Sequence, residues 1–328
     1  MAIAPASFTW KDGERTIHFG RGALDAALPS LGSGYTLLTT ERALAMAPDV
    51  GEQAGDIFEV GPGRVDELAA ELVGHVGPVR RIVALGGGRV IDTAKALAAV
   101  RELRSRARVA AVPTTLSAAE MTAVHRRAAH SDTSLPGARP SIVVNDPALS
   151  ASQPLPELAA SAANALAHAA EGPATMHASP VPALAGAEAA RLIGEAYADG
   201  GDEPDRDALA LAALLSGYTI DSAGYGLHHV VSQTLARVAG VPHGAANAVM
   251  LAHTLVALER RGAAGAGALV VLATDLAQRA QAVSLRALGV DEAALDACAD
   301  AAAGRPELDA TPPRPDRDEL RALYAAAY

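Results

Sequence analysis

Three histidines in the second half of the chain stand where imidazole side chains could do chemistry. Asn164 and His168 are four residues apart in NALAHAAEG, so on a helix both side chains point to one face. His229 lies in GLHHVVSQTL, and His243 follows a proline at the start of another apolar segment. Imidazoles brought together from several elements can bind a divalent metal. For any single histidine, a polar residue satisfied in a helical core is the more common interpretation.

A run of three glycines follows the apolar segment RIVAL and precedes a helix-like segment. The three are Gly86, Gly87 and Gly88. Glycines let the backbone approach a ligand closely, and the free N–H groups at a helix start suit a pyrophosphate. Arg89 stands at the mouth of this turn and could add charge, and Asp92 could cap the first helical turn or hold the loop. Lys95 is spaced to share a helix face with Asp92, and all three are candidate cofactor-binding residues. The order is not the GxGxxG of the usual Rossmann fingerprint, and a tight turn without a ligand is the alternative.

Two hydroxyl side chains, Thr114 and Thr115, follow the strand-like segment VAAVP. In a parallel sheet such loops emerge at the carboxyl edge, where ligands bind. The pair therefore indicates contacts to phosphate or ribose. A helix-capping turn is an equally good interpretation of the same residues.

The first half of the chain alternates strand-like and helix-like segments that would position these residues. The expected strands span 16–19, 35–40, 56–60, 81–85, 109–113 and 141–145, and the expected helices span 23–31, 41–46, 65–76 and 90–100. This alternation predicts a Rossmann-like α/β domain with a parallel sheet covered by helices. From residue 157 onward every segment is helix-like and alanine dominates. We therefore place an α/β domain in residues 1–150 and an all-α domain in 151–328.

Composition excludes several classes of protein. The chain has 328 residues, 50% of them hydrophobic and 20% charged, so it is neither disordered nor fibrous. A net charge of −10 argues against a nucleic-acid partner. The longest apolar stretch, residues 262–274, is shorter than the roughly 20 residues of a membrane helix. The chain has one cysteine, Cys298, so no internal disulfide can form, which fits a reducing compartment. We expect Cys298 to be buried and the protein to be soluble and cytoplasmic.

Four motifs, in this order, resemble the iron-containing alcohol dehydrogenase superfamily, and its maleylacetate reductase branch most. They are GGGRVIDTAKA, AVPTTLSAAEMT, NALAHAAEG and GLHHVVSQTLARVAGVPHGAANAVMLAH. The resemblance covers nearly the whole chain, including its tail. It implies a dehydroquinate synthase-like architecture, with a nucleotide-binding domain, a helical substrate domain and an active site in the cleft between them. It also implies NADH or NADPH as cofactor, a small-molecule substrate and a homodimer.

The metal ligands of the metal-dependent relatives are an aspartate and three histidines. The matching positions here are Asn164, His168, His229 and His243. A neutral amide oxygen is a weaker ligand than a carboxylate, and the resembling maleylacetate reductases also have asparagine there. The resemblance therefore implies that no metal is required.

Three further departures from the family pattern concern the redox site and the cofactor. Most relatives have another histidine one turn after the His229 position, where this chain has Gln233, which cannot move protons near neutral pH. Arg89 replaces a small polar residue after the glycines. NAD-specific relatives have an acidic residue where this chain has Thr40, so NADPH should be tolerated beside NADH.

We therefore predict an NAD(P)H-dependent reductase of a conjugated oxo acid or a carbonyl compound. His168, His229 and His243 would form a polar pocket that binds a substrate oxygen and supplies the proton. A first alternative is an iron- or zinc-dependent alcohol dehydrogenase. A second is a family member whose redox site is repurposed or silenced through Gln233. A third, a dehydroquinate synthase-like cyclase, needs several lysines in the site, whereas the chain has only Lys11 and Lys95.

Overall fold

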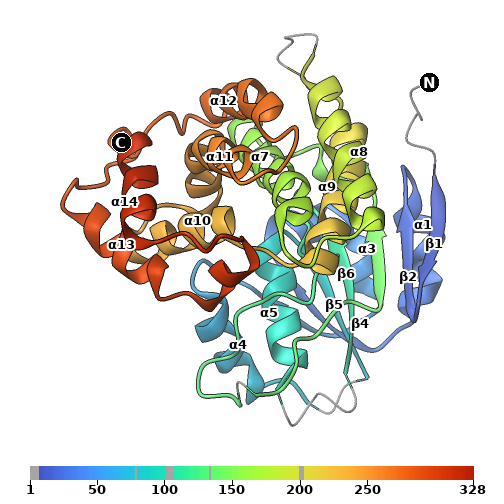
Figure 1. Cartoon of the computed structure of the whole chain (residues 1–328). Coiled ribbons are helices and arrows are strands. Elements are labelled where there is room, and N and C mark those ends of the chain that lie inside the picture. Colours follow the sequence, from blue (N-terminus) through green and yellow to red (C-terminus); the bar gives the residue numbers. More distant parts are fainter. Residues whose placement is uncertain (1–6, 78–79, 101–106, 133, 199–202) are drawn as a thin grey trace. The chain divides into compact units, whose positions relative to one another are not determined.

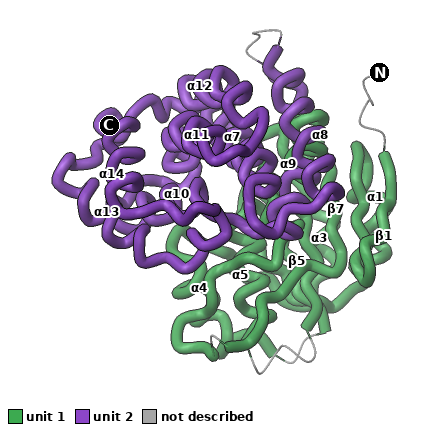
Figure 2. The backbone as a smooth tube through the Cα atoms, viewed as in Figure 1, with its two compact units in different colours: residues 1–153, 206–214 green, residues 154–205, 215–328 purple. Residues whose placement is uncertain are grey.

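The chain forms two compact units, coloured separately in Figure 2. The computed structural model describes residues 7–77, 80–100, 107–132, 134–198 and 203–328. Unit 1 comprises residues 1–153 and 206–214, and unit 2 comprises residues 154–205 and 215–328. Helix α9 (Arg206–Ala223) contributes residues to both units.

A seven-stranded sheet forms the centre of unit 1, in the order β1-β2-β7-β6-β5-β3-β4. Its strands are β1 (Phe8–Asp12), β2 (Arg15–Phe19), β3 (Tyr35–Thr39), β4 (Ala54–Glu59), β5 (Arg81–Gly86), β6 (Arg108–Pro113) and β7 (Ile142–Asn145). The predicted parallel pairing is confirmed for every neighbouring pair except β1 with β2, which are antiparallel. Strand β1 was not predicted, although the Asp-Gly pair at its end is a hairpin signal. The sheet is therefore mixed, with one antiparallel edge.

Helices cover both faces of this sheet (Figure 1). Helices α4 (Val65–Val73) and α5 (Gly88–Ala98) pack on one face, and α1 (Ala23–Leu31), α2 (Glu41–Met46) and α3 (Pro48–Glu52) pack on the other. Strand β5 explains why both faces need cover. Its residues 82 and 84 belong to one core and residues 83 and 85 to the other, and all four are fully buried. Such a continuous apolar run is typical of a parallel strand between two helical layers.

Unit 2 is helical throughout its described residues. Besides part of α9, its helices are α7 (Leu155–Glu171), α8 (Pro180–Ala196), α10 (Leu227–Val238), α11 (His243–Arg260), α12 (Val270–Arg279), α13 (Ala294–Ala303) and α14 (Arg317–Ala326). Helices α7, α10 and α11 pack against one another, and the many alanines of α7 and α11 combine high helix propensity with small volume. Cys298 is buried on α13, as predicted. Within the part of the chain that the structure describes, no helix is long and apolar enough to cross a membrane.

Candidate functional site

The glycine turn lies where the chain connections of the sheet diverge. Strands β3 and β5 are neighbours, but the chain leaves β3 for β4 on one side and leaves β5 for β6 on the other. Parallel sheets bind ligands outside the carboxyl ends of the strands at such a switch point. Thr40 follows β3, and the turn of residues 86–88 follows β5. The two predicted cofactor contacts therefore lie at neighbouring strand ends.

The loop after β6 packs directly onto this turn. A Cβ atom on Gly88 would lie 2.9 Å from Cβ of Ser117, and one on Gly87 would lie 3.1 Å from Oγ1 of Thr115. Glycine is therefore required at Gly88 by close packing. No side chain caps the start of α5, which begins at Gly88. A helix N-terminus beside a side-chain-free turn is suited to binding phosphate.

The hydroxyl of Thr114 is buried beside the same turn. Its backbone N–H donates to the carbonyl of Gly86 at 3.0 Å, which holds the loop against the turn. Its Oγ1 atom is buried and has no hydrogen-bond partner within the described residues. Buried polar atoms are rarely left unpaired in folded proteins. An oxygen-rich ligand such as a dinucleotide fits this position, and Thr115 lies next to it.

Two other predicted contact residues have different environments. Thr40 is the N-cap of α2, and its Oγ1 accepts a hydrogen bond from the backbone N–H of Ala43 at 3.2 Å. Its side chain brings no negative charge to the end of β3. Arg89 is exposed on the first turn of α5.

The structure corrects the role of Lys95. Its side chain is fully buried, and Nζ donates to the carbonyls of Ala119 and Val124, each at 2.8 Å, and of Thr122 at 3.1 Å. The same Nζ forms an ion pair with Asp92 at 2.8 Å. An ammonium has only three hydrogens to donate, so these groups occupy it fully. Lys95 and Asp92 therefore hold the loop after β6 in place, which is one of the two roles expected of Asp92, and Nζ of Lys95 has no hydrogen left for a phosphate oxygen.

Glu120, which the sequence did not single out, is buried in that loop. It is 1% exposed, and its Oε1 accepts from Nδ2 of Asn145 at 3.4 Å. Its Oε2 has no hydrogen-bond partner within the described residues. Burial raises the pKa of Glu120 to about 7, although the charge of Lys95 opposes this effect.

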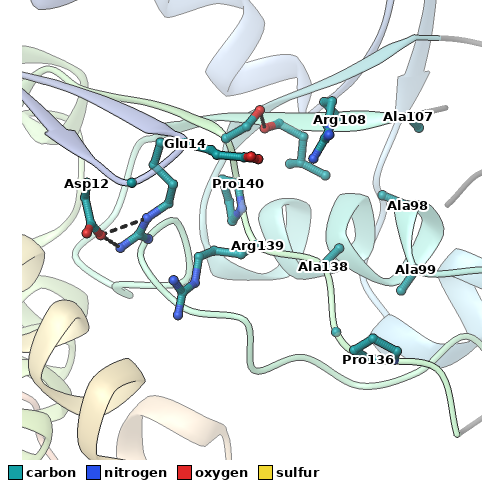
Figure 3. Close-up of a pocket in the computed structure, with 15 residues that line it drawn as sticks. Asp12, Glu14, Ala98, Ala99, Ala107, Arg108, Pro136, Ala138, Arg139 and Pro140 are labelled. Atoms are coloured by element: carbon teal, nitrogen blue, oxygen red, sulfur yellow. Dashed lines mark hydrogen bonds and ion pairs between the residues drawn. The ribbon is translucent and has the colours of Figure 1, made fainter. Parts of the chain in front are cut away.

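A cavity of about 480 Å³ lies at the amino ends of the strands (Figure 3), whereas the glycine turn lies at a carboxyl end. Its lining residues are 12–15, 98–99, 107–109 and 136–141, so it lies at the amino ends of β2, β6 and β7. Asp12 and Arg15 form an ion pair there. Ligands of parallel α/β sheets bind at the carboxyl edge, so this cavity does not coincide with the predicted cofactor site.

Two predicted histidines come together in unit 2. His168 on α7 and His229 on α10 stack with ring centroids 4.7 Å apart and an interplanar angle of 15°. His228 lies edge-on to His229, with its ring centroid at 5.1 Å. All three rings are buried. Asn164 lies one turn before His168 on α7 and is half-buried.

A buried carboxylate from α7 holds this cluster. Oε2 of Glu171 lies 2.5 Å from Nδ1 of His229, and its Oε1 accepts from the backbone N–H of His228 at 2.5 Å. Glu171 thus accepts from the first backbone N–H groups of α10, and a negative charge is favourable at this helix N-terminus. The sequence contained a signal for Glu171, because it lies three residues after His168 in NALAHAAEG and so shares a helix face with that histidine.

The Glu171 contact determines which nitrogen of His229 is left for chemistry. With Nδ1 facing the carboxylate, Nε2 of His229 is buried and has no hydrogen-bond partner in the described part of the chain. The same is true of Nδ1 of His168. Burial lowers the pKa of His229 to about 3 and the pKa of His168 well below its usual range, so both rings are neutral at pH 7.

His243 is the exposed end of a polar chain. Its Nε2 lies 3.1 Å from Nδ2 of Asn247, whose Oδ1 lies 3.2 Å from Nε2 of His228. Nδ1 of His228 in turn lies 2.8 Å from Oγ1 of Thr254. Asn247 therefore occupies a nitrogen of His243 that a metal would use.

The positions that match the family's metal ligands carry a weak donor set. Among the described residues, no three His, Cys, Asp or Glu side chains are grouped so that they could hold a metal ion. The position of the family's carboxylate ligand is the neutral Asn164, and Asn247 occupies one nitrogen of His243. A set in which a neutral amide replaces the carboxylate binds a divalent ion more weakly, and no step below uses a metal.

Gln233 lies one turn after His229 on α10 and is tied to a second polar group. Its Oε1 accepts from Nη2 of Arg305 at 3.1 Å. Arg305 also donates from Nη2 and Nε to both carboxylate oxygens of Glu307, at 2.7 and 2.9 Å. The hydroxyl of Tyr225 lies 3.1 Å from Glu307, and its ring centroid lies 5.7 Å from that of His229. The sequence prediction missed these residues, because Arg305 lies 72 residues beyond Gln233 and no local pattern links the two.

Comparison with known proteins places both halves of the chain. A model described as "Iron-containing alcohol dehydrogenase" matches residues 15–147, and one described as "Fe-containing alcohol dehydrogenase family, C-terminal" matches residues 158–264. The chain is 33% identical to maleylacetate reductase from Burkholderia cepacia, over 75% of this chain and 73% of that protein. It is 30% identical to maleylacetate reductase from Rhizobium sp. strain MTP-10005, over 87% and 85%. The crystal structure of the latter enzyme superposes with a TM-score of 0.80 and 27% identity over 98% of each chain.

Proposed function

This chain belongs to the iron-containing alcohol dehydrogenase family, in the branch of the maleylacetate reductases, and we propose that it is an NAD(P)H-dependent reductase of a conjugated oxo acid. Membership makes it an oxidoreductase. One observation carries the proposed chemistry, namely the buried pair of His168 and His229, each with a ring nitrogen left unpaired within the described residues.

Unit 1 binds the cofactor through backbone and hydroxyl groups. The turn of residues 86–88 and the start of α5 receive the phosphates, with Thr114 and Thr115 beside them. Thr40 brings no carboxylate to the end of β3, so the 2′-phosphate of NADPH is accepted as well as the hydroxyl of NADH. When bound, either nicotinamide cofactor supplies the hydride.

Unit 2 binds the substrate oxygen and supplies the proton. With its Nδ1–H donated to Glu171, neutral His229 presents a lone pair at Nε2, so it can donate to the substrate oxygen only after Nε2 has taken up a proton from solvent. The negative charge that develops on that oxygen during reduction favours this protonation. Glu171 fixes the ring of His229 through Nδ1, so a proton taken up at Nε2 can pass to the reduced substrate. The carboxylate also stabilises the imidazolium while that proton is held. His243 is exposed, and Asn247 joins it by hydrogen bonds to His228 in the buried cluster.

This reaction would need no metal, because protonated His229 would stabilise the negative substrate oxygen in place of a Lewis acid. The donor chemistry supports this part of the proposal, since Asn164 stands at the carboxylate position and Asn247 occupies His243. Treatment with a strong chelator should leave the activity unchanged. The metal-dependent alcohol dehydrogenase would instead be favoured by a protein that contains stoichiometric metal, loses its activity when that metal is removed, and regains it with added Fe²⁺ or Zn²⁺.

A steady-state assay tests the proposed function directly. Maleylacetate and related oxo acids are offered with NADH and with NADPH, and oxidation of the cofactor is followed by its near-ultraviolet absorbance. We expect turnover with at least one oxo acid, and a loss of about 100-fold or more in kcat for His229→Asn. If no oxo acid or aldehyde oxidises either cofactor, the proposed function is wrong. Size-exclusion chromatography with light scattering tests the expected homodimer.

A further inference from the structure

Arg305 carries a largely buried guanidinium group, and one of its nitrogens has no acceptor among the described residues. Its side chain is only 13% exposed. Nε and Nη2 are bound to Glu307, and Nη2 also reaches Gln233. Nη1, however, is buried and has no hydrogen-bond partner within the described residues. Buried donors of a charged group are almost always satisfied, so this nitrogen indicates a missing acceptor.

The group is connected to the histidine cluster through α10. Gln233 stands one turn after His229 on that helix, and its oxygen is turned towards Arg305 at 3.1 Å. Tyr225 makes a second link, because its hydroxyl bonds Glu307 and its ring lies beside His229. The guanidinium is thus fixed from two sides next to the helix that carries the proposed proton donor.

These contacts also explain what Gln233 does in this chain. A glutamine oxygen accepts a hydrogen bond from a guanidinium at any pH, whereas a protonated histidine would repel it. Glu307 holds the other edge, and Arg305 in turn keeps the pKa of Glu307 low, at about 2. A guanidinium held on one edge presents its remaining N–H groups in a fixed plane, which is the geometry that a carboxylate accepts.

We propose that Nη1 of Arg305, positioned by Glu307 and Gln233, binds a carboxylate of the substrate and so selects anionic oxo acids over neutral carbonyl compounds. The inference rests on the proposed reductase function and adds the residue that determines substrate class. It assigns Gln233 a positioning role, so the departure from histidine alters specificity instead of silencing the site.

A binding experiment tests the inference separately from turnover. Maleate, a dicarboxylate that lacks the reducible oxo group, is titrated calorimetrically into the wild-type protein, Arg305→Gln and Arg305→Lys. Its dimethyl ester is the neutral probe. We expect maleate to bind about 10- to 100-fold more weakly to Arg305→Gln, with partial recovery in Arg305→Lys and no change for the ester. NADPH affinity should be equal in all three proteins.

A matched control removes a different arginine near the same segment. Arg317→Gln breaks exposed ion pairs with Asp296 and Asp300 on α13 and does not touch Arg305. Its maleate affinity should equal that of the wild type. Thermal melts identify variants that are not folded, and Arg305→Lys keeps the test decisive if Arg305→Gln does not fold.

Three outcomes would overturn the inference: no binding of maleate to the wild type, unchanged affinity in both Arg305 variants, or equal losses for maleate and its ester. The last is the result expected if Arg305 only stabilises the segment around residues 304–310. Failure of the proposed function has a different signature. In that case no oxo acid is turned over, although maleate still binds in an Arg305-dependent way.

Discussion

Glu120 should make the protein less stable as the pH rises. Burial raises the pKa of this carboxyl from 4.5 to about 7, so the native state keeps a proton that the unfolded chain releases. The free energy of unfolding therefore falls between about pH 4.5 and pH 7 and is constant above that range. At about 1.4 kcal/mol for each pKa unit, the full effect is about 3 kcal/mol.

The assay compares the wild type with Glu120→Gln, which keeps the shape of the side chain and removes the titration. Urea unfolding at pH 5, 6, 7 and 8 gives the free energy of unfolding of each protein. The two proteins should be nearly equal at the acid end, and the variant should be more stable by about 3 kcal/mol at pH 8. Other titrating groups affect both proteins alike, so the difference between them isolates Glu120. The assignment of a raised pKa would be refuted if the difference in unfolding free energy did not depend on pH, or if the wild type became more stable relative to the variant as the pH rises.

Three further substitutions test the roles assigned to single residues. Lys95→Met should lower the free energy of unfolding by about 3–5 kcal/mol, measured by urea denaturation, because it leaves the carboxylate of Asp92 and three backbone carbonyls without their ammonium partner. A loss below about 1 kcal/mol would argue against this holding role. Gly88→Ala should weaken NADPH binding more than tenfold in a fluorescence titration. The new Cβ would lie 2.9 Å from Cβ of Ser117, so the turn that receives the phosphates would have to shift. Unchanged affinity would mean that the phosphates bind elsewhere. Glu171→Gln should lower kcat by about 10- to 100-fold, because the carboxylate orients the ring of His229. The NADPH dissociation constant should not change. An unaltered kcat would show that Glu171 has no part in the mechanism.

Local signals explain which elements of the fold could be predicted. The helices that start at Ala23 and Glu41 begin where expected, because a glycine precedes the first and a capping threonine precedes the second. Strand β5 was recognised because a continuous apolar run between polar segments fits only a strand buried on both faces. Strand β1 was missed because its side chains are mostly exposed, so it lacks that apolar run. Its place in the sheet comes from pairing with β2.

The sequence alone determined which residues share a helix face or follow a strand. It placed Asn164 with His168, Asp92 with Lys95, and the glycine turn at the end of a buried strand, because helical and extended periodicity act over a few residues. It also established the family through four ordered motifs, which matching models and relatives confirm.

Only the tertiary structure decided which faces meet. Lys95 turned out to hold carbonyls 24 to 29 residues further along the chain. His168 and His229 stack across two helices, and Arg305 reaches back 72 residues to Gln233. Such pairings depend on how helices pack, and packing is set by the fit of many side chains at once. A helix pattern can therefore show that a residue faces inward, but the partner that it meets there is a property of the folded chain.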